Sequence, residues 1–248
     1  MKKCFFLFLL LFCVFPLITN AAPLVRDREF YEQTGNVIWD FKNMNKKVIS
    51  ITFDDGPDPI YTPEILDLLA QYNAKATFFV SGNKAEEHPD ILKRIAKEGH
   101  EIGNHTYNHI YNASISEKTL SAELDSTNNL IEKVTGYRPV LYRPVGGLYN
   151  DSIINTAVKK DYLVIMWSWH QDPMDWSNPG SKKIVNHVIS NVRPGDIVLL
   201  HDSGGDRTQT ISALKSILEH LKKHQYTVVT VSDLIVHSED IPSILFDF

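Results

Sequence analysis

Cysteine is almost absent from this chain of 248 residues. There are two, Cys4 and Cys13, and both lie in the first apolar segment. Residues 14–248 hold no thiol, which excludes a disulfide framework in that part of the chain. Any metal bound there must have nitrogen and oxygen ligands, since soft sulfur ligands are missing.

A run of lysine and arginine is also missing. The formal net charge is -5, whereas a nucleic-acid partner requires a concentrated basic surface. We therefore expect no nucleic acid among the partners. The hydrophobic content of 43% is enough for a core, and the length suits one domain with a short N-terminal extension.

The apolar run at the start of the chain is short for a membrane span, which needs roughly 20 residues. It covers Cys4–Ile18, follows Lys2 and Lys3, and precedes small residues that offer cleavage positions. This pattern predicts a signal peptide over residues 1–22, with an uncleaved anchor as the alternative. We expect a secreted or cell-envelope protein that is monomeric and has no stable membrane span after cleavage.

Strand-like and helix-like segments alternate from Lys46 onward. Residues 23–45 predict a leader that packs on the domain, residues 46–236 the main domain, and residues 237–248 a tail. About seven strand-then-helix units favour parallel strands with helices outside. The predicted fold is therefore α/β, a distorted or incomplete (β/α) barrel with outer helices. A doubly wound open sheet is the alternative.

Capping signals predict where several helices begin. Thr62 followed by Pro63 predicts an N-cap and a first helical residue, and Ser114 with Glu117 resembles a capping box. A later helix is predicted from one apolar face, formed by Ile211, Leu214, Ile217, Leu218 and Leu221.

Polar side chains that are capable of catalysis follow the predicted strands. In parallel α/β barrels the carboxyl ends of the strands form one face, and active sites are built there. We therefore expect five segments to deliver carboxylates, imidazoles and a guanidinium to one place. In chain order these are Asp54 and Asp55, His105 and His109, Arg143, Asp172 and Asp175, and His201 and Asp202.

Two adjacent carboxylates, Asp54 and Asp55, leave an apolar strand. Neighbouring side chains point in different directions, which favours one carboxylate that binds metal and another that takes a proton. The alternative is an Asx-type turn, because Asp-Gly-Pro is common turn chemistry.

His105 and His109 are four residues apart, which predicts two rings on one face of a helical turn, a spacing that suits a metal. With one aspartate they form a two-histidine-one-carboxylate set with open positions, as hydrolytic metal sites require. His220 and His224 share this spacing, but they fall on a solvated helix face.

His201 ends an apolar strand and has two interpretations. It is either a structural histidine or, in a metal site that lacks another proton donor, the general acid for a leaving amine. Arg143 either orients a carboxylate through a bidentate pair or forms a structural salt bridge. The glycines after it, Gly146 and Gly147, free backbone N–H groups to approach a substrate oxyanion.

The motifs T-F-D-D-G, H-T-x-x-H, R-P-x-x-G, D-x-x-D-W and L-x-H-D occur in this order. Together they resemble the polysaccharide deacetylases of carbohydrate esterase family four, of the chitin, peptidoglycan and nodulation-factor type. The resemblance runs from Lys46 to Ile235. It implies a hydrolase that removes acetyl groups from N-acetylated sugars, with a polysaccharide as substrate and a divalent metal, usually zinc and sometimes cobalt, as cofactor.

The resemblance also implies the central roles. Asp54 matches the general base and His201 the general acid. The metal ligands match Asp55, His105 and His109.

Supporting roles follow from the same resemblance. Arg143 matches the arginine that positions a catalytic carboxylate, and Asp175 the carboxylate that tunes the catalytic histidine. Leu199 matches the apolar wall that holds the acetyl methyl group, and Trp176 matches a pocket wall.

One segment departs from the family pattern, which is typically R-P-P-(aromatic)-G. Val145 and Gly146 replace the second proline and the aromatic residue. Gly146 still offers the backbone N–H that binds the oxyanion in the family, but a wall for sugar stacking is lost. This departure bears on substrate preference more than on chemistry.

Three other functions stay open at the level of sequence. The same site would serve an O-acetyl esterase, such as an acetylxylan esterase. A catalytically impaired glycan-binding homologue is supported only by the altered arginine segment. A structural metalloprotein predicts a closed four-ligand site, whereas only three ligands are evident.

Overall fold

A sheet of eight parallel strands forms the centre of residues 24–238, the part of the chain that this computed structural model describes. Its order is β1-β6-β5-β4-β3-β2-β7, and β8 pairs with the first half of β2. The strands are β1 (Val37–Ile38), β2 (Val48–Asp54), β3 (Thr77–Val80), β4 (Glu101–Asn104), β5 (Leu141–Tyr142), β6 (Leu163–Ile165), β7 (Ile197–His201) and β8 (Thr227–Val229). Strands β2 to β6 are neighbours in chain order, which confirms the predicted parallel (β/α) fold.

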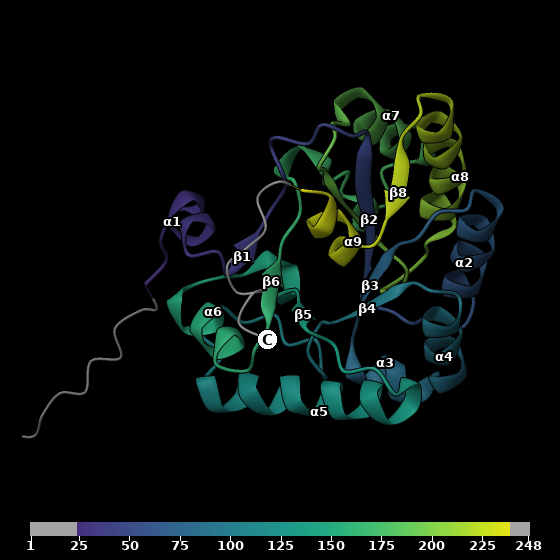
Figure 1. Cartoon of the computed structure of the whole chain (residues 1–248). Helices are drawn as coiled ribbons and strands as arrows, with labels where there is room; N and C mark the ends of the chain where they lie inside the picture. Colours follow the sequence, from purple (N-terminus) through teal and green to yellow (C-terminus); the bar gives the residue numbers. More distant parts are fainter. Residues whose placement is uncertain (1–23, 239–248) are drawn as a thin grey trace, which may run out of the picture.

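Helices surround this sheet (Figure 1). They are α1 (Arg28–Gln33), α2 (Tyr61–Gln71), α3 (Gly82–Glu87), α4 (Pro89–Lys97), α5 (Glu117–Thr135), α6 (Asp151–Val158), α7 (Ser181–Asn191), α8 (Thr208–Lys223) and α9 (Val231–His237). The apolar face predicted for α8 is confirmed, because its leucines and Ile217 are buried and Ile211 packs against the same core. Among the described residues, no helix has the length and apolar character that a membrane crossing requires.

The two ends of the curled sheet are joined by backbone contacts outside the strand ladders. Ser168 N–H donates to Ile197 O at 3.0 Å, and Ile197 N–H donates to the Ser168 hydroxyl at 3.0 Å. Phe41 N–H donates to Gly195 O, also at 3.0 Å. These bonds connect the segments after β1 and β6 to the start of β7, so the barrel is incomplete but bridged.

The predicted leader supplies the edge strand of the sheet. β1 pairs with β6 through Val37 opposite Val164, and Trp39 behind it is fully buried. The Tyr31 hydroxyl donates to Asp151 Oδ1 at 2.7 Å, which ties α1 to α6. The described part of the leader therefore belongs to the domain.

Both predicted capping residues were wrong by a few positions. α2 begins at Tyr61, and the Asp58 carboxylate accepts the N–H groups of Ile60 and Tyr61 at 2.8 and 3.0 Å. Thr62 lies inside this helix, where its hydroxyl donates to Asp202 and accepts the Asp58 N–H at 2.8 Å. α5 begins after Ser116, whose hydroxyl accepts the N–H of the third helical residue.

Some predictions fall outside the described residues. These are the signal peptide over residues 1–22, with both cysteines, and all but the first two residues of the tail over residues 237–248.

Candidate active site and metal centre

A cavity of about 430 Å³ lies at the carboxyl ends of the strands. Each of the five segments predicted to converge contributes to its wall or to the layer behind it. The wall consists of Asp54, Asp55, His105, His109, Tyr111, Val145, Gly146, Trp167, Asp172, Trp176, Leu199 and His201. Arg143, Asp175 and Asp202 are buried. Arg143 holds Asp54 and Asp175 holds His201 from behind the wall.

Asp55, His105 and His109 present three ligand atoms within 4.8 Å of one another. Asp55 Oδ1 lies 2.8 Å from His109 Nε2 and 3.4 Å from His105 Nε2. A tetrahedral cation with bonds of about 2.1 Å spaces its ligands about 3.4 Å apart, so the set fits such a cation after small adjustments. His105 Nδ1 hydrogen-bonds to Arg143 O at 2.8 Å, which leaves Nε2 for a metal.

The histidine pair lies in a loop after β4, so the predicted helical turn was wrong. Thr106 and His109 have φ values of 67° and 54°, in the left-handed region. The buried Glu123 carboxylate on α5 accepts the N–H groups of Tyr107 and Asn108 at 2.9 and 2.6 Å. This tertiary contact holds the loop in a shape that still brings both imidazoles to Asp55.

The electrostatics of this cluster favour a negative charge on Asp55 and a positive charge on His109. Burial raises the pKa of Asp55, but hydrogen bonds from His105 and His109 outweigh it and hold the pKa well below its usual range. The hydrogen bond to Asp55 raises the pKa of His109 against the opposing effect of burial. A cation would therefore compete with the proton on His109.

Asp54, the neighbour of Asp55 in the chain, is nearly fully buried. Arg143 Nη1 donates to Asp54 Oδ1 at 2.7 Å and to Thr52 Oγ1 at 2.6 Å. Asp54 Oδ2 lies 3.9 Å from His105 Nε2, on the side of the three candidate ligands. The Asp54 carboxylate thus lies between the Arg143 guanidinium and the candidate metal ligands.

The predicted bidentate pair between Arg143 and this carboxylate was wrong. Arg143 Nε donates to Ile165 O at 3.1 Å, and Nη2 donates to Met166 O at 2.7 Å. These carbonyls at the end of β6 take the donors that a bidentate pair needs. Burial lowers the pKa of Arg143, while the charge of Asp54 and the hydrogen bond to it raise the pKa.

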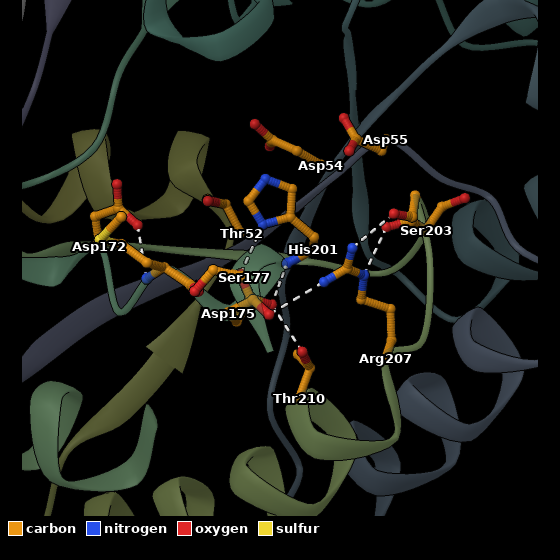
Figure 2. Close-up of polar contacts among 12 residues, drawn as sticks. Thr52, Asp54, Asp55, Asp172, Asp175, Ser177, His201, Ser203, Arg207 and Thr210 are labelled. Atoms are coloured by element: carbon orange, nitrogen blue, oxygen red, sulfur yellow. Dashed lines mark hydrogen bonds and ion pairs between the residues drawn. The ribbon is translucent and has the colours of Figure 1, made fainter. Parts of the chain in front are cut away.

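Figure 2 shows His201 between Asp175 and the two carboxylates at the end of β2, Asp54 and Asp55. Asp175 Oδ1 contacts His201 Nδ1 at 2.7 Å, and Oδ2 accepts the His201 N–H at 3.0 Å. Burial lowers the pKa of His201, but the bond to Asp175 and the charges of Asp175, Asp54 and Asp55 outweigh burial and raise the pKa to about 9. The raised pKa favours the protonated ring at neutral pH, and the contact of Nδ1 with Asp175 leaves Nε2 for the cavity.

Two residues that sequence reasoning missed support Asp175 (Figure 2). The Thr210 hydroxyl donates to Asp175 Oδ2 at 2.8 Å. The buried Arg207 donates to the Asp175 carbonyl at 3.2 Å and to Ser203 O at 2.7 Å. In the sequence, these two residues are marked only as polar side chains at the start of the apolar face of α8.

Asp202 is a support residue behind the cavity. It is fully buried, accepts the Thr62 hydroxyl at 2.5 Å, and lies against Gly56, where a Cβ atom would overlap its carboxyl group. Burial raises the pKa of Asp202 to about 7, although the bond from Thr62 lowers it. Asp202 thereby connects the loops that follow β2 and β7.

The residues expected to shape the pocket lie on its wall. Leu199 is buried, whereas the Trp176 side chain is 51% exposed at the rim. Gly146, with φ of 60°, follows β5. Asp172 faces the same cavity, and burial raises its pKa. Tyr111 also lines the cavity, although the sequence analysis did not select it.

Comparisons with known proteins agree with this geometry. Residues 41–165 match the polysaccharide deacetylase family. A peptidoglycan-N-acetylglucosamine deacetylase of Bacillus cereus is 52% identical over 84% of this chain and 97% of its own length. A peptidoglycan-N-acetylmuramic acid deacetylase of Bacillus subtilis is 40% identical over 77% of this chain and 39% of its own. A crystal structure of a peptidoglycan N-acetylglucosamine deacetylase has a TM-score of 0.79 at 35% identity, over 84% of this chain and 96% of that chain.

Proposed function

This chain belongs to the polysaccharide deacetylase family, and from that premise we propose that it is a metal-dependent N-deacetylase of N-acetylglucosamine units in peptidoglycan. One observation carries the proposal. A two-histidine-one-carboxylate set lies in a single cavity with a carboxylate, Asp54, and a histidine, His201, whose pKa is raised by Asp175. Amide hydrolysis needs a base for water and an acid for the leaving amine, and this cavity holds both.

We assign the cation to Asp55, His105 and His109. A divalent ion bound there supplies Lewis acidity and lowers the pKa of water. Zinc suits these nitrogen and oxygen ligands and the open position they leave. Cobalt remains the second candidate.

Asp54 takes the proton of the attacking water, and Arg143 holds the Asp54 carboxylate in place through Oδ1. As the C–O bond forms at the acetyl carbon, the Gly146 N–H stabilises the charge on the former carbonyl oxygen. His201 then donates a proton from Nε2 to the sugar nitrogen, and the C–N bond breaks. The products are acetate and a free amino sugar.

The walls of the cavity position the acetamide group. Leu199 contacts the acetyl methyl, and Trp176 limits the space at the rim. Asp175 keeps the His201 ring oriented by binding Nδ1. The apolar segment at the start of the chain supports secretion to the cell envelope, where peptidoglycan is the substrate.

Acetate release tests this proposal. Purified protein should release acetate from peptidoglycan and from chitooligosaccharides, lose the activity with a chelator, and regain it with zinc or cobalt. Asp54→Asn and His201→Ala should each lower kcat by about 10²- to 10⁴-fold, while the bound metal is retained. Controls are Asp90→Asn and His220→Ala, at an exposed surface carboxylate and at the histidine pair outside the cavity.

Three results would contradict the proposal. Faster release from acetylated xylan than from N-acetylated glycans would favour the O-acetyl esterase. Binding of glycan without acetate release would favour the impaired homologue. Unchanged turnover in either catalytic variant would remove that residue from its role.

A further inference from the structure

The ring of Tyr111 lies over the backbone of Gly146 at the active-site cavity. Both residues line this cavity, and the tyrosine side chain is 69% exposed. A Cβ atom at Gly146 would lie 2.8 Å from Tyr111 Cδ2 and closer still to Cε2. The ring therefore occupies the space that any side chain at position 146 would need.

Local structure on both sides maintains this contact. Gly146 has φ of 60°, which lies in the left-handed region that glycine adopts without strain. Tyr111 follows the metal-binding loop that Glu123 holds. The next residues of that loop are tied down by the Asn150 amide, which donates to Ala113 O at 2.7 Å. The tyrosine is thus exposed but its backbone is anchored.

Exposed aromatic side chains that gather at one cavity are typical of a ligand-binding groove. Tyrosine combines an apolar face with a polar tip, which suits contacts with partly polar ligands. Trp176, the other exposed aromatic of this cavity, follows β6, whereas Tyr111 follows β4. These two strands flank β5 in the sheet. A pyranose has an apolar face of C–H groups, which matches such rings.

We propose that Tyr111 is the aromatic platform on which a sugar ring of the substrate stacks beside the metal centre. It restores, from the loop after β4, the wall that the segment Arg143–Gly147 lacks. The expectation that this wall is lost thus holds only for the segment itself. The inference rests on the proposed function, because it specifies how the same cavity holds a pyranose.

Kinetics of Tyr111 variants test the inference. Tyr111→Ala should raise KM for a chitooligosaccharide about five- to tenfold, as expected from loss of one aromatic contact. Its kcat should stay within about twofold of the wild type, because no reacting group changes. Tyr111→Phe keeps the ring and should restore the KM. Tyr137→Ala removes another exposed tyrosine, 39% exposed and outside the cavity, and should leave KM unchanged.

Tyr111→Leu separates stacking from simple cover of Gly146. Leucine keeps an apolar cover but has no flat ring, so we expect the Tm and zinc affinity of the wild type with the high KM of Tyr111→Ala. A wild-type KM in Tyr111→Leu or Tyr111→Ala would overturn the inference. So would a raised KM that appears only together with a lower Tm.

Failure of the Tyr111 platform can be distinguished from failure of the proposed function. If the wild type releases no acetate from any glycan, the proposed function fails. Calorimetric titration of wild type and Tyr111→Ala with chitooligosaccharide then tests the platform by itself. A Kd about five- to tenfold higher in Tyr111→Ala than in the wild type supports the platform, and equal Kd values overturn it.

Discussion

Arg143 shows how much a single buried side chain organises at this site. Its guanidinium contacts Asp54, Thr52 and two carbonyl groups at the end of β6. A lysine has one charged nitrogen and cannot make this planar set of contacts. The residue thereby sets the position of the proposed base relative to three strands.

His201 and Asp175 form the second pair whose effect is local. A general acid donates only while it is protonated, so kcat/KM falls as pH rises through the pKa of His201. Asp175 raises this pKa. Asp175→Asn should therefore move the basic limb of the pH profile to lower pH and reduce kcat at neutral pH. Rates measured from pH 6 to 10 on zinc-loaded protein check this.

Thr208→Ala is a suitable control for that experiment, because Thr208 begins α8 two residues before Thr210 and does not contact Asp175. Its profile should match that of the wild type. A basic limb that stays in place in Asp175→Asn would contradict the assignment of His201 as the acid.

At the scale of elements, the loops after the strands carry the site, and helices hold the loops. Glu123 on α5 fixes the loop between His105 and His109 through two backbone N–H groups and the Asn108 amide. Thr210 and Arg207, in or next to α8, hold the segment around Asp175. The ligand geometry thus depends on contacts with elements that lie outside the barrel.

Substitution of Glu123 tests this dependence. Glu123→Ala frees the two N–H groups and lets His109 depart from Asp55, so zinc affinity should fall about 10- to 100-fold, as for outer-shell residues in general. Competition with a chromophoric chelator measures the affinity. Glu132→Ala, on the exposed face of the same helix, should bind zinc like the wild type. Equal affinity in Glu123→Ala would show that the loop holds itself.

At the scale of the whole molecule, the curled sheet brings its ends together so that strands far apart in the sheet share one cavity. Ser168 is central to this closure, since it contacts Ile197 through both its N–H and its hydroxyl. The same segment after β6 supplies the carbonyls that bind Arg143. Closure of the barrel and placement of the proposed base, Asp54, are therefore linked.

Ser168→Ala leaves the buried Ile197 N–H without its acceptor. The free energy of unfolding should fall by about 1–3 kcal/mol, the cost of an unsatisfied buried donor. Urea unfolding followed by circular dichroism measures this. Ser212→Ala, on the exposed face of α8, should change stability by a few tenths of a kcal/mol or stabilise slightly. A loss no larger than in this control would mean that the closure contributes little.

Much of the site could be predicted because strand ends and residue types are local properties. The positions of Asp54 and His201 after apolar strands follow from the alternation of strands and helices, and the parallel fold follows from the same pattern. The helical turn at His105 and the bidentate contact of Arg143 were wrong because partners distant in sequence determined the local geometry. The cap at Thr62 was wrong because α2 begins one residue earlier, where the nearby Asp58 carboxylate accepts two N–H groups.

The sequence by itself determined which side chains are available, that the strands are parallel, and that the catalytic residue types gather at one end of the barrel. The tertiary structure alone decided how they are held. Glu123 shapes the loop of the proposed metal ligands, the carbonyls after β6 accept two of the Arg143 donors, and Tyr111 fills the space above Gly146. These contacts join segments far apart in the chain, and no local pattern specifies such pairs before the barrel curls.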